Sequence, residues 1–479
     1  MGELRHLLVD ARPIDHPTAR NRGIGRYTLG LLSGLQQVEA PLVALYETTT
    51  EAELLDEAIP GLALRQWSPA AVREFAREGT WYLATQLMLH PIPLDPVPRI
   101  ITDAGLPVAA VMYDVIPERY PELYQQRATA RAQVQLRGML SRTLDALLAI
   151  SEFAADTAAA ELRFPRDRIA TIGAGVDQQF VPRSSDPWPR LARVLARDER
   201  DLVVMVAGTD TRKNTEGMLR AWGLVPNELR VTHRLVVVAE VGGVQLAQWQ
   251  QWADEFGVAR DVTFTGGVTD EEMVALHQAA SLAVMPSIEE GFGLPVLEAA
   301  ACGCVVIASS TSSLPEVLAH DGAEFDPHDA NSIAVAVIRA LTDAPHRIEL
   351  RAAGARAVDR WTWANAARLS VDALSTMGPR RRREIAPPPW RVALQGRFDD
   401  SAAGVANTAL ADAIRSLPHA PEVHLLVEHG PAGNPTDAGD ARFPARALGR
   451  FVHTSLFDRV ITLADDSDRG ALLQSLLAR

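Results

Sequence analysis

Two glutamates and two adjacent basic residues are the side chains in this sequence best suited to chemistry. Glu290 and Glu298 have seven residues between them, and a carboxylate can accept two hydrogen bonds, as a ribose diol requires. Arg212 and Lys213 together could hold a diphosphate and stabilise its charge as it leaves. The alternatives are two capping or surface glutamates and an exposed basic pair on a loop.

The loop that carries the glutamates has the pattern of an anion site. A strand is expected over 282–285, and Gly291 and Gly293 then let the backbone approach a ligand closely. A helix is expected over about 295–302, because Pro295 suits a first turn and a glycine follows the last. A helix N-terminus at the carboxyl end of a strand binds anions. Glu298 would lie in the first turn of this helix, where the dipole favours a carboxylate.

The basic pair follows a second expected strand, 202–206, and a turn at Gly208. We expect Arg212 and Lys213 at the start of the next helix, whose amides would also face a diphosphate. The chain has 47 lysines and arginines, of which Lys213 is the single lysine. A single lysine at this position indicates either that the site needs a compact ammonium group or that the lysine is there by chance. A third loop, 22–27, contains Gly23 and Gly25 and could close on the diphosphate, or form a tight turn without ligand contact.

These motifs resemble a known family. The runs PSIEEGFGLPVLEAAACG and FTGGVTDEEMVALHQAASLAVMPS, the RKN turn and the E-x7-E spacing are similar to retaining glycosyltransferases of family 4, which have the GT-B fold. The resemblance covers roughly residues 5–377. The segments RGIGRYTLGLLSGL and MYDVIPERYPELY look closest to bacterial O-antigen mannosyltransferases.

The resemblance implies a role for each matching residue. Glu298 would bind the ribose, and Glu290 would contact the donor sugar near its reacting carbon. Arg212 and Lys213 would hold the diphosphate. Further contacts with the donor are expected from the glycine loop, whose backbone amides are those of Gly291, Phe292, Gly293 and Leu294. Val268 would lie against the base, and Gly25 would approach the phosphate.

One position departs from the family pattern. Many relatives carry a histidine before the aspartate of the strand-end motif in the first domain, and this chain has Tyr113 followed by Asp114. A tyrosine can hydrogen-bond a sugar but is a poor base near neutral pH. Asp114 either orients the acceptor or caps the local turn. The family is usually described as letting the departing phosphate take the acceptor's proton, so no general base is assigned.

Composition limits the other possibilities. The net charge of −13 argues against a nucleic-acid partner, and no apolar run is long enough to span a membrane. We therefore expect a cytoplasmic protein, without a metal or other cofactor. The stretch 127–142, with arginines at 127, 131, 137 and 142, either faces solvent or lies on an anionic membrane. Cys302 and Cys304 are expected in the core, and the acidic cluster 465–468 in a solvated turn.

Alternating short apolar runs and helical stretches predict an α/β fold with parallel sheets. We expect a GT-B arrangement of two Rossmann-like domains with a cleft between them, and a C-terminal partial repeat of an N-terminal-type half. The expected segments are an acceptor domain (1–183), a donor-binding domain (197–360), a helix crossing back (361–377), a linker (378–389) and the partial repeat (390–479). The last segment is either an incomplete duplication or part of a longer protein with a further glycosyltransferase domain.

The predicted activity is transfer of a hexosyl group, possibly mannosyl, from a GDP- or UDP-sugar to a glycan or lipid-linked glycan acceptor. Such a reaction belongs to polysaccharide or O-antigen synthesis. Two alternatives remain: a non-catalytic nucleotide- or glycan-binding module, and a nucleotide-sugar epimerase of the same fold. The inner membrane is a further possible partner, through a peripheral contact.

Overall fold

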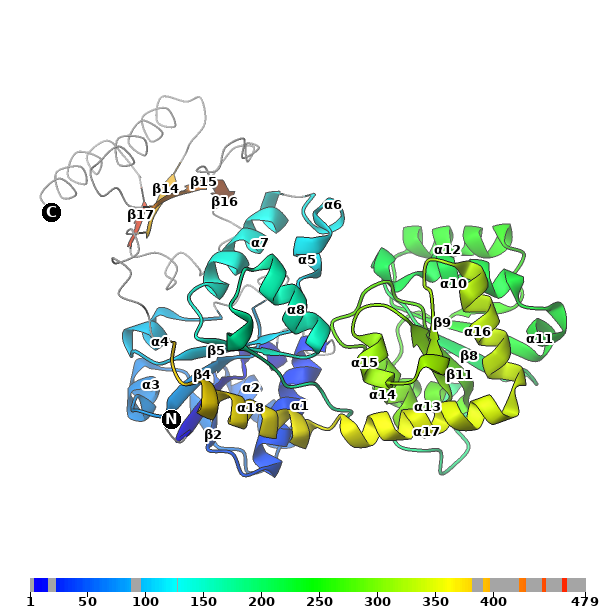
Figure 1. The fold of residues 1–479 in the computed structure, drawn as a ribbon, viewed down its shortest axis with the longest axis horizontal. Coiled ribbons are helices and arrows are strands. Elements are labelled where there is room, and N and C mark those ends of the chain that lie inside the picture. Colours follow the sequence, from blue (N-terminus) through cyan, green and yellow to red (C-terminus); the bar gives the residue numbers. More distant parts are fainter. Residues whose placement is uncertain are drawn as a thin grey trace, which may run out of the picture.

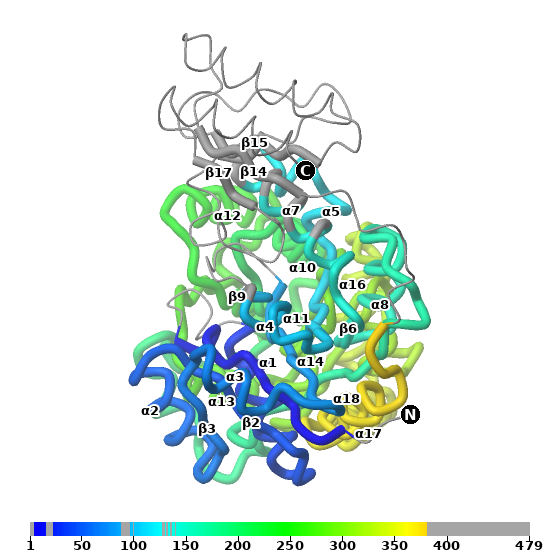
Figure 2. Tube along the Cα trace, turned by 90° about the vertical axis from the view of Figure 1, so that its left-hand side faces the viewer, coloured from blue at the N-terminus to red at the C-terminus, as the bar shows by residue number. Residues whose placement is uncertain are grey.

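The computed structural model describes residues 4–15, 23–87, 96–126 and 128–380, together with the strand segments 391–396, 422–427, 442–444 and 459–462. The described chain forms two α/β domains side by side along the long axis of the molecule (Figure 1). Figure 2 looks along that axis with the first domain in front of the second. Three sets of residues named in the sequence analysis lie outside the described residues: position 127, residues 381–389 of the linker and the acidic cluster 465–468.

The first domain is built on a seven-stranded sheet with the order β3-β2-β1-β4-β5-β6-β7, in which all pairings are parallel. Its strands are nearly continuous apolar runs because helices cover both faces of a parallel sheet. The strands are β1 (His6–Asp10), β2 (Leu42–Tyr46), β3 (Leu64–Gln66), β4 (Thr80–Ala84), β5 (Val108–Met112), β6 (Ala146–Ala149) and β7 (Ile169–Thr171). The helices are α1 (Gly23–Gln37), α2 (Thr49–Ala58), α3 (Pro69–Phe75), α4 (Arg99–Asp103), α5 (Ile116–Arg119), α6 (Pro121–Tyr124), α7 (Ala128–Ser141) and α8 (Glu152–Glu161).

The second domain repeats this plan with a six-stranded parallel sheet of order β10-β9-β8-β11-β12-β13. Its strands are β8 (Asp201–Val206), β9 (His233–Val238), β10 (Val262–Phe264), β11 (Ala280–Met285), β12 (Val306–Ser309) and β13 (Glu324–Phe325). Its helices are α9 (Trp188–Leu191), α10 (Thr215–Leu224), α11 (Asn227–Thr232), α12 (Gly243–Glu255), α13 (Asp270–Ala279), α14 (Leu294–Ala301), α15 (Leu314–Leu318), α16 (Ala330–Thr342) and α17 (Ala344–Arg360).

The strand order of the second sheet reverses between β8 and β11. Successive strands run outward from β8 on one side and from β11 on the other. In open α/β sheets, ligands bind beyond the carboxyl ends of the strands at such a reversal. The loops after β8 and β11 carry the basic pair and the glycine-rich run, so the topology brings the two predicted halves of the site together.

Helix α18 (Trp363–Met377) leaves the second domain and packs on α1 of the first (Figure 1). Small residues on α1 make this close approach possible. A Cβ at Gly34 would lie 2.2 Å from the backbone oxygen of Trp363, and one at Gly30 would lie 2.1 Å from its ring. The Trp363 ring also meets Tyr27 edge-on, with 5.0 Å between centroids. The helix therefore ties the two domains together.

Four short strands of the C-terminal segment are described: β14 (Arg391–Gly396), β15 (Glu422–Val427), β16 (Arg442–Pro444) and β17 (Arg459–Thr462). They pair in parallel in the order β16-β15-β14-β17. The first four strands of the chain have the same order, β3-β2-β1-β4. The shared order is the one expected of a partial repeat of the N-terminal half.

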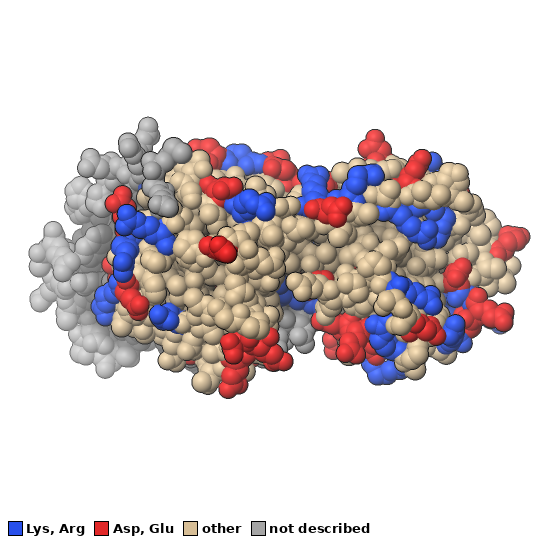
Figure 3. All heavy atoms as spheres, turned by 90° about the horizontal axis from the view of Figure 1, so that it is seen from below, with Lys and Arg blue, Asp and Glu red and all other residues tan. Residues whose placement is uncertain are grey.

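Core and surface follow the usual division of side chains. Cys302 and Cys304 are buried, which confirms their expected place in the core. Figure 3 shows acidic and basic side chains interspersed over both domains. None of the helices among the described residues combines the length and apolar character needed to cross a bilayer.

Candidate active site between the two domains

The two basic residues lie in a tight turn that follows β8. Arg212 and Lys213 belong to a 3-10 turn, Thr211–Lys213, and not to the start of α10 as the sequence suggested. Asp210 caps this turn by accepting a hydrogen bond from the Arg212 amide (3.1 Å). Asn214 then adopts a left-handed conformation (φ 57°), and α10 begins only at Thr215. The left-handed residue redirects the chain, so the two cations precede the helix.

Both cations converge on one carboxylate. Lys213 Nζ donates to Glu290 Oε1 at 2.6 Å, and Arg212 Nη1 donates to Glu290 Oε2 at 3.0 Å. The second sheet therefore brings together the three residues to which the sequence assigned catalysis. Arg212 is fixed further by Asp210 Oδ2, 2.8 Å from its Nε, and by the carbonyl oxygen of Glu289, 2.7 Å from its Nη1.

Charge sets the protonation of Glu290. Burial by itself would raise the pKa of this carboxyl, but Lys213 and Arg212 outweigh burial and lower the pKa to about 2. The pKa of Arg212 lies above its usual value, since Glu290 and Asp210 outweigh the opposing effect of burial. The three side chains thus form a charged cluster with one net positive charge, close to a loop rich in backbone amides.

Gly291 and Gly293 occupy positions in the glycine loop where a larger residue would clash or be strained. Gly293 has φ 99° and is the N-cap of α14, so the helix begins at Leu294, one residue earlier than expected. A Cβ at Gly291 would lie 2.3 Å from the carbonyl oxygen of Tyr113 in the first domain. Ser151 of the first domain also donates to the carbonyl of Gly291 at 2.6 Å. The loop is therefore held directly against the first domain.

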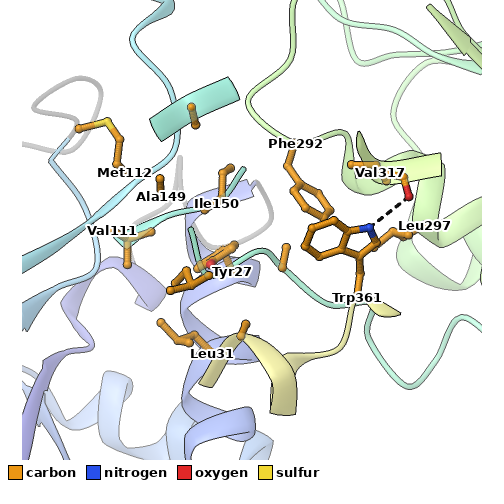
Figure 4. Packing of buried hydrophobic residues seen from close by; sticks show 14 of the residues in the cluster. Tyr27, Leu31, Val111, Met112, Ala149, Ile150, Phe292, Leu297, Val317 and Trp361 are labelled. Atoms are coloured by element: carbon orange, nitrogen blue, oxygen red, sulfur yellow. Dashed lines mark hydrogen bonds between the residues drawn. The ribbon is translucent and has the colours of Figure 1, made fainter. Parts of the chain in front are cut away.

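The side chain of Phe292 points away from the charged cluster. Its ring is buried and meets Trp361 edge-on, with centroids 5.2 Å apart, and the Trp361 indole donates to the carbonyl of Val317 at 3.1 Å (Figure 4). Phe292 can thus offer a ligand only its backbone. Leu294 and Val268 are partly buried, and Val268 packs against a small core cluster beneath the loop that precedes α13.

Glu298 differs from Glu290 in its environment. It is the fifth residue of α14, beyond the first turn, so the prediction that the helix dipole favours its carboxylate is wrong. Burial raises the pKa of Glu298 to about 7, although Arg26 and Lys213 pull it down. Two carboxyls with pKa values pushed apart in one site are a feature of acid–base and ligand-binding centres.

Arg26 reaches Glu298 from the first domain and is a residue that the sequence analysis missed. Its Nη1 donates to Glu298 Oε1 at 3.4 Å, and it also pairs with Asp270. The expected glycine loop at 22–27 is in fact the first turn of α1 from Gly23 onwards, and Gly25 is buried within that helix. Arg26, beside Gly25, thus contacts the second domain from this helix, and the approach of Gly25 to a phosphate stays a prediction.

Further contacts between the domains surround the charged cluster, and these were also missed. Glu289 is buried and accepts hydrogen bonds from Arg119 Nε (3.1 Å) and the Tyr120 hydroxyl (2.8 Å). Tyr124 donates to Asp210, the residue that fixes Arg212. All three donors lie in the segment MYDVIPERYPELY, whose proline-broken short helices gave no hint that they face the other domain.

The two residues expected near the acceptor are both engaged within the first domain. The Tyr113 hydroxyl donates to the carbonyl of Thr85 at 2.8 Å, and burial raises its pKa far above the usual value. Asp114 Oδ1 accepts a hydrogen bond from the amide of Ile116, the first residue of α5, at 3.1 Å. Arg137 was expected to face solvent or a membrane, but it is buried and paired with Glu118, its Nε 2.7 Å from Oε1.

Comparisons with known proteins find similarity to glycosyltransferases. Residues 190–357 match the family described as "Glycosyl transferases group 1". The serotype-specific mannosyltransferase WbdA of Escherichia coli is 31% identical over 289 residues, which cover 60% of this chain and 34% of WbdA. The O-antigen chain mannosyltransferase B of the same organism is 30% identical over 47% of this chain and 59% of its own length. This chain thus spans only about a third of the length of WbdA.

Solved structures share the architecture. Sucrose-phosphate synthase of Thermosynechococcus elongatus superposes with a TM-score of 0.54 at 18% identity, covering 76% of this chain and 97% of its own. HepE of Anabaena, solved in complex with UDP and glucose, gives 0.57 at 17% identity, covering 78% of this chain and all of its own. At this identity the likeness shows the fold alone. The chain has the GT-B fold, and its residues 190–357 form a glycosyl transferases group 1 domain.

Proposed function

We propose that this protein is a retaining glycosyltransferase of family 4 that moves a hexosyl group from a nucleoside-diphosphate sugar to a glycan hydroxyl. The observation that carries the proposal is the convergence of Lys213 and Arg212 on Glu290, beside the glycine loop at the reversal point of the second sheet. Two cations and a row of backbone amides are suited to bind a diphosphate and to stabilise the charge that develops on it as the sugar leaves.

The donor would exchange contacts with residues that are paired in its absence. The diphosphate would take over part of the bonding that Lys213 and Arg212 now give to Glu290, which would then be free to contact the donor sugar. The ribose hydroxyls would bind Glu298, in place of the weak 3.4 Å contact from Arg26. Val268, Leu294 and the backbone amides of the glycine loop would complete the donor site.

The acceptor side supports a reaction that needs no protein base. The Tyr113 hydroxyl already donates to a carbonyl and has a raised pKa, so it is unsuited to remove a proton near neutral pH. In the retaining scheme the acceptor oxygen bonds to the anomeric carbon on the face that the diphosphate leaves. The departing phosphate oxygen takes the acceptor's proton, and configuration is retained.

Similarity to the two mannosyltransferases of Escherichia coli supports mannose as the transferred sugar and GDP-mannose as the donor. Their names also support a growing O-antigen or a related glycan, free or lipid-linked, as the acceptor. Paired cations can balance the diphosphate charge, and we propose that no metal is required. A peripheral contact with the inner membrane from the cytoplasmic side belongs to the same proposal.

The test is donor turnover by the full chain. GDP-mannose, GDP-glucose, UDP-glucose and UDP-galactose are incubated with the protein, with and without EDTA, and release of the nucleoside diphosphate is followed. GDP-mannose should be consumed, and EDTA should leave the rate unchanged. The variant Glu298→Ala should have a higher KM for GDP-mannose. Glu255→Gln, an exposed glutamate on α12, is the matched control. Failure of all four sugar nucleotides to bind by calorimetry would refute the proposal.

A further inference from the structure

A cavity of about 300 Å³ opens beside the charged cluster, between α5, α6 and α7 of the first domain and the turn after β8 of the second. Both apolar and polar side chains line it. Its walls are formed by Asp114, Ile116, Pro117, Tyr124, Ala130, Gln133, Val134, Arg137, Asp210 and Arg212. This volume lies at the small end of the range for ligand pockets, which suits a sugar unit and excludes a long lipid chain.

Gln133 contributes a polar side chain to this wall. Its side-chain carbonyl oxygen is buried, and no described residue donates a hydrogen bond to it. A buried polar atom without a partner is unfavourable by an amount comparable to a lost hydrogen bond, so such an atom usually has a ligand or water. A hydroxyl group inside the cavity would supply the missing donor.

The charges around the cavity already balance one another. Arg137 pairs with Glu118, and Arg212 pairs with Asp210 and Glu290. Tyr124 donates to Asp210. A charged ligand would have to break one of these buried pairs, at a large free-energy cost. The cavity therefore favours a neutral ligand with hydroxyl groups and an apolar face, which is the chemistry of an unmodified hexose ring packed against Ile116 and Val134.

Arg212 places this cavity next to the reaction. Its guanidinium forms part of the cavity wall, and its Nη1 is 3.0 Å from Glu290 Oε2 in the donor site. A molecule in the cavity is thus separated from the diphosphate site by a single side chain.

We infer that the cavity binds the neutral terminal sugar of the acceptor, with Gln133 as a residue that selects it by accepting one of its hydroxyl protons. This inference rests on the proposed function. A second hydroxyl of the same sugar attacks the anomeric carbon of the donor. The bond from that carbon to the diphosphate oxygen breaks, and the proton of the attacking hydroxyl passes to the departing phosphate.

The experiment compares three variants of the full chain. Gln133→Leu removes the hydrogen-bonding amide at similar volume, Ala130→Trp fills the cavity from α7, and Gln250→Leu on α12 is the exposed control. Methyl α-glycosides of mannose, glucose and galactose serve as acceptor probes. Their binding is measured by saturation-transfer NMR in the presence of GDP, and transfer to them is measured with GDP-mannose.

We expect Gln133→Leu to raise the acceptor KM by about five- to tenfold, the loss of one hydrogen bond, with the donor KM unchanged. Ala130→Trp should abolish binding of the glycoside, and Gln250→Leu should behave as the wild type. A purely structural role for Gln133 would instead lower stability and change both KM values together. Gln133→Glu, which keeps an acceptor oxygen, should retain more acceptor affinity than Gln133→Leu.

The two proposals fail in different ways. Normal donor turnover together with unchanged acceptor KM in both cavity variants would overturn the cavity assignment and leave the glycosyltransferase proposal standing. Binding of no methyl glycoside to the wild-type chain would also overturn it. Absence of donor binding in the wild-type chain would overturn the glycosyltransferase proposal itself.

Discussion

Substitution of Glu290 by glutamine tests whether a shared carboxylate holds the two cations in place. Glu290 Oε1 lies 2.6 Å from Lys213 Nζ, and its Oε2 lies 3.0 Å from Arg212 Nη1. Glutamine keeps the size and one acceptor oxygen but removes the charge. Two positive groups then face each other without the anion between them. We expect lower stability without donor and a relative gain when a diphosphate supplies the missing charge.

The size of the effect follows from burial. Removing one partner of a buried ion pair destabilises a protein by about 3–5 kcal/mol. The side chains here are 9% exposed for Glu290 and 20% and 17% for its partners, so water screens the pair partly and the lower end applies. A loss of about 3 kcal/mol lowers the melting temperature of a domain of this size by about 6–12 °C. GDP at a hundred times its Kd should recover about 2.7 kcal/mol.

Scanning calorimetry at neutral pH, with and without GDP, measures both effects, and Glu255→Gln is the control. The pKa of Glu290 is lowered to about 2, so its contribution to stability is complete above the unfolded value of 4.5 and is lost as pH falls through about 2. The difference between wild type and variant should therefore shrink in acid. If Glu290→Gln melted with the wild type at neutral pH and bound GDP equally well, the cations would be held by other contacts and the reasoning would be refuted.

Three further predictions concern the donor site. Since the pKa of Glu298 is about 7 and the ribose needs its carboxylate form, GDP affinity measured by calorimetry should fall about tenfold for each pH unit below 7 in the wild type, and stay flat in Glu298→Gln. Gly291→Ala should reduce kcat about a hundredfold, because the added Cβ would lie 2.3 Å from the backbone oxygen of Tyr113 and force the domains apart. X-ray scattering would detect this opening. The control is Gly243→Ala, which places its Cβ in open space and should have no effect. Lys213→Ala should lower kcat about a hundredfold in a donor-turnover assay, and wild-type turnover would contradict its role on the leaving group.

The sequence predicts the elements of the second domain well because each chemical motif follows an apolar strand and precedes a helix. The expected strand 202–206 is observed as Asp201–Val206, and the expected strand 282–285 lies within Ala280–Met285. Strands β2, β3, β4, β7 and β13 were missed. Three of them, β3, β7 and β13, contain two or three residues, which is too few for a hydrophobic period to appear.

Errors at the site arose where a single backbone angle decides the local path. The left-handed Asn214 separates the basic pair from α10, and the left-handed Gly293 starts α14 before its proline. Neither angle can be read from residue type with certainty, since asparagine and glycine adopt several conformations. The shift makes Glu298 the fifth residue of α14 instead of the fourth, and burial raises its pKa.

The residues that the sequence analysis missed share one property: each contacts a partner in the other domain. Arg26 meets Glu298, Arg119 and Tyr120 meet Glu289, and Tyr124 meets Asp210. Local periodicity carries no information about a surface that exists only when the two domains come together. Because Glu289 adjoins Glu290 and Asp210 fixes Arg212, these contacts link the closed arrangement of the domains to the geometry of the cations. Donor binding and acceptor binding should therefore depend on each other, since both require the segment 116–124 to be seated against the turn after β8.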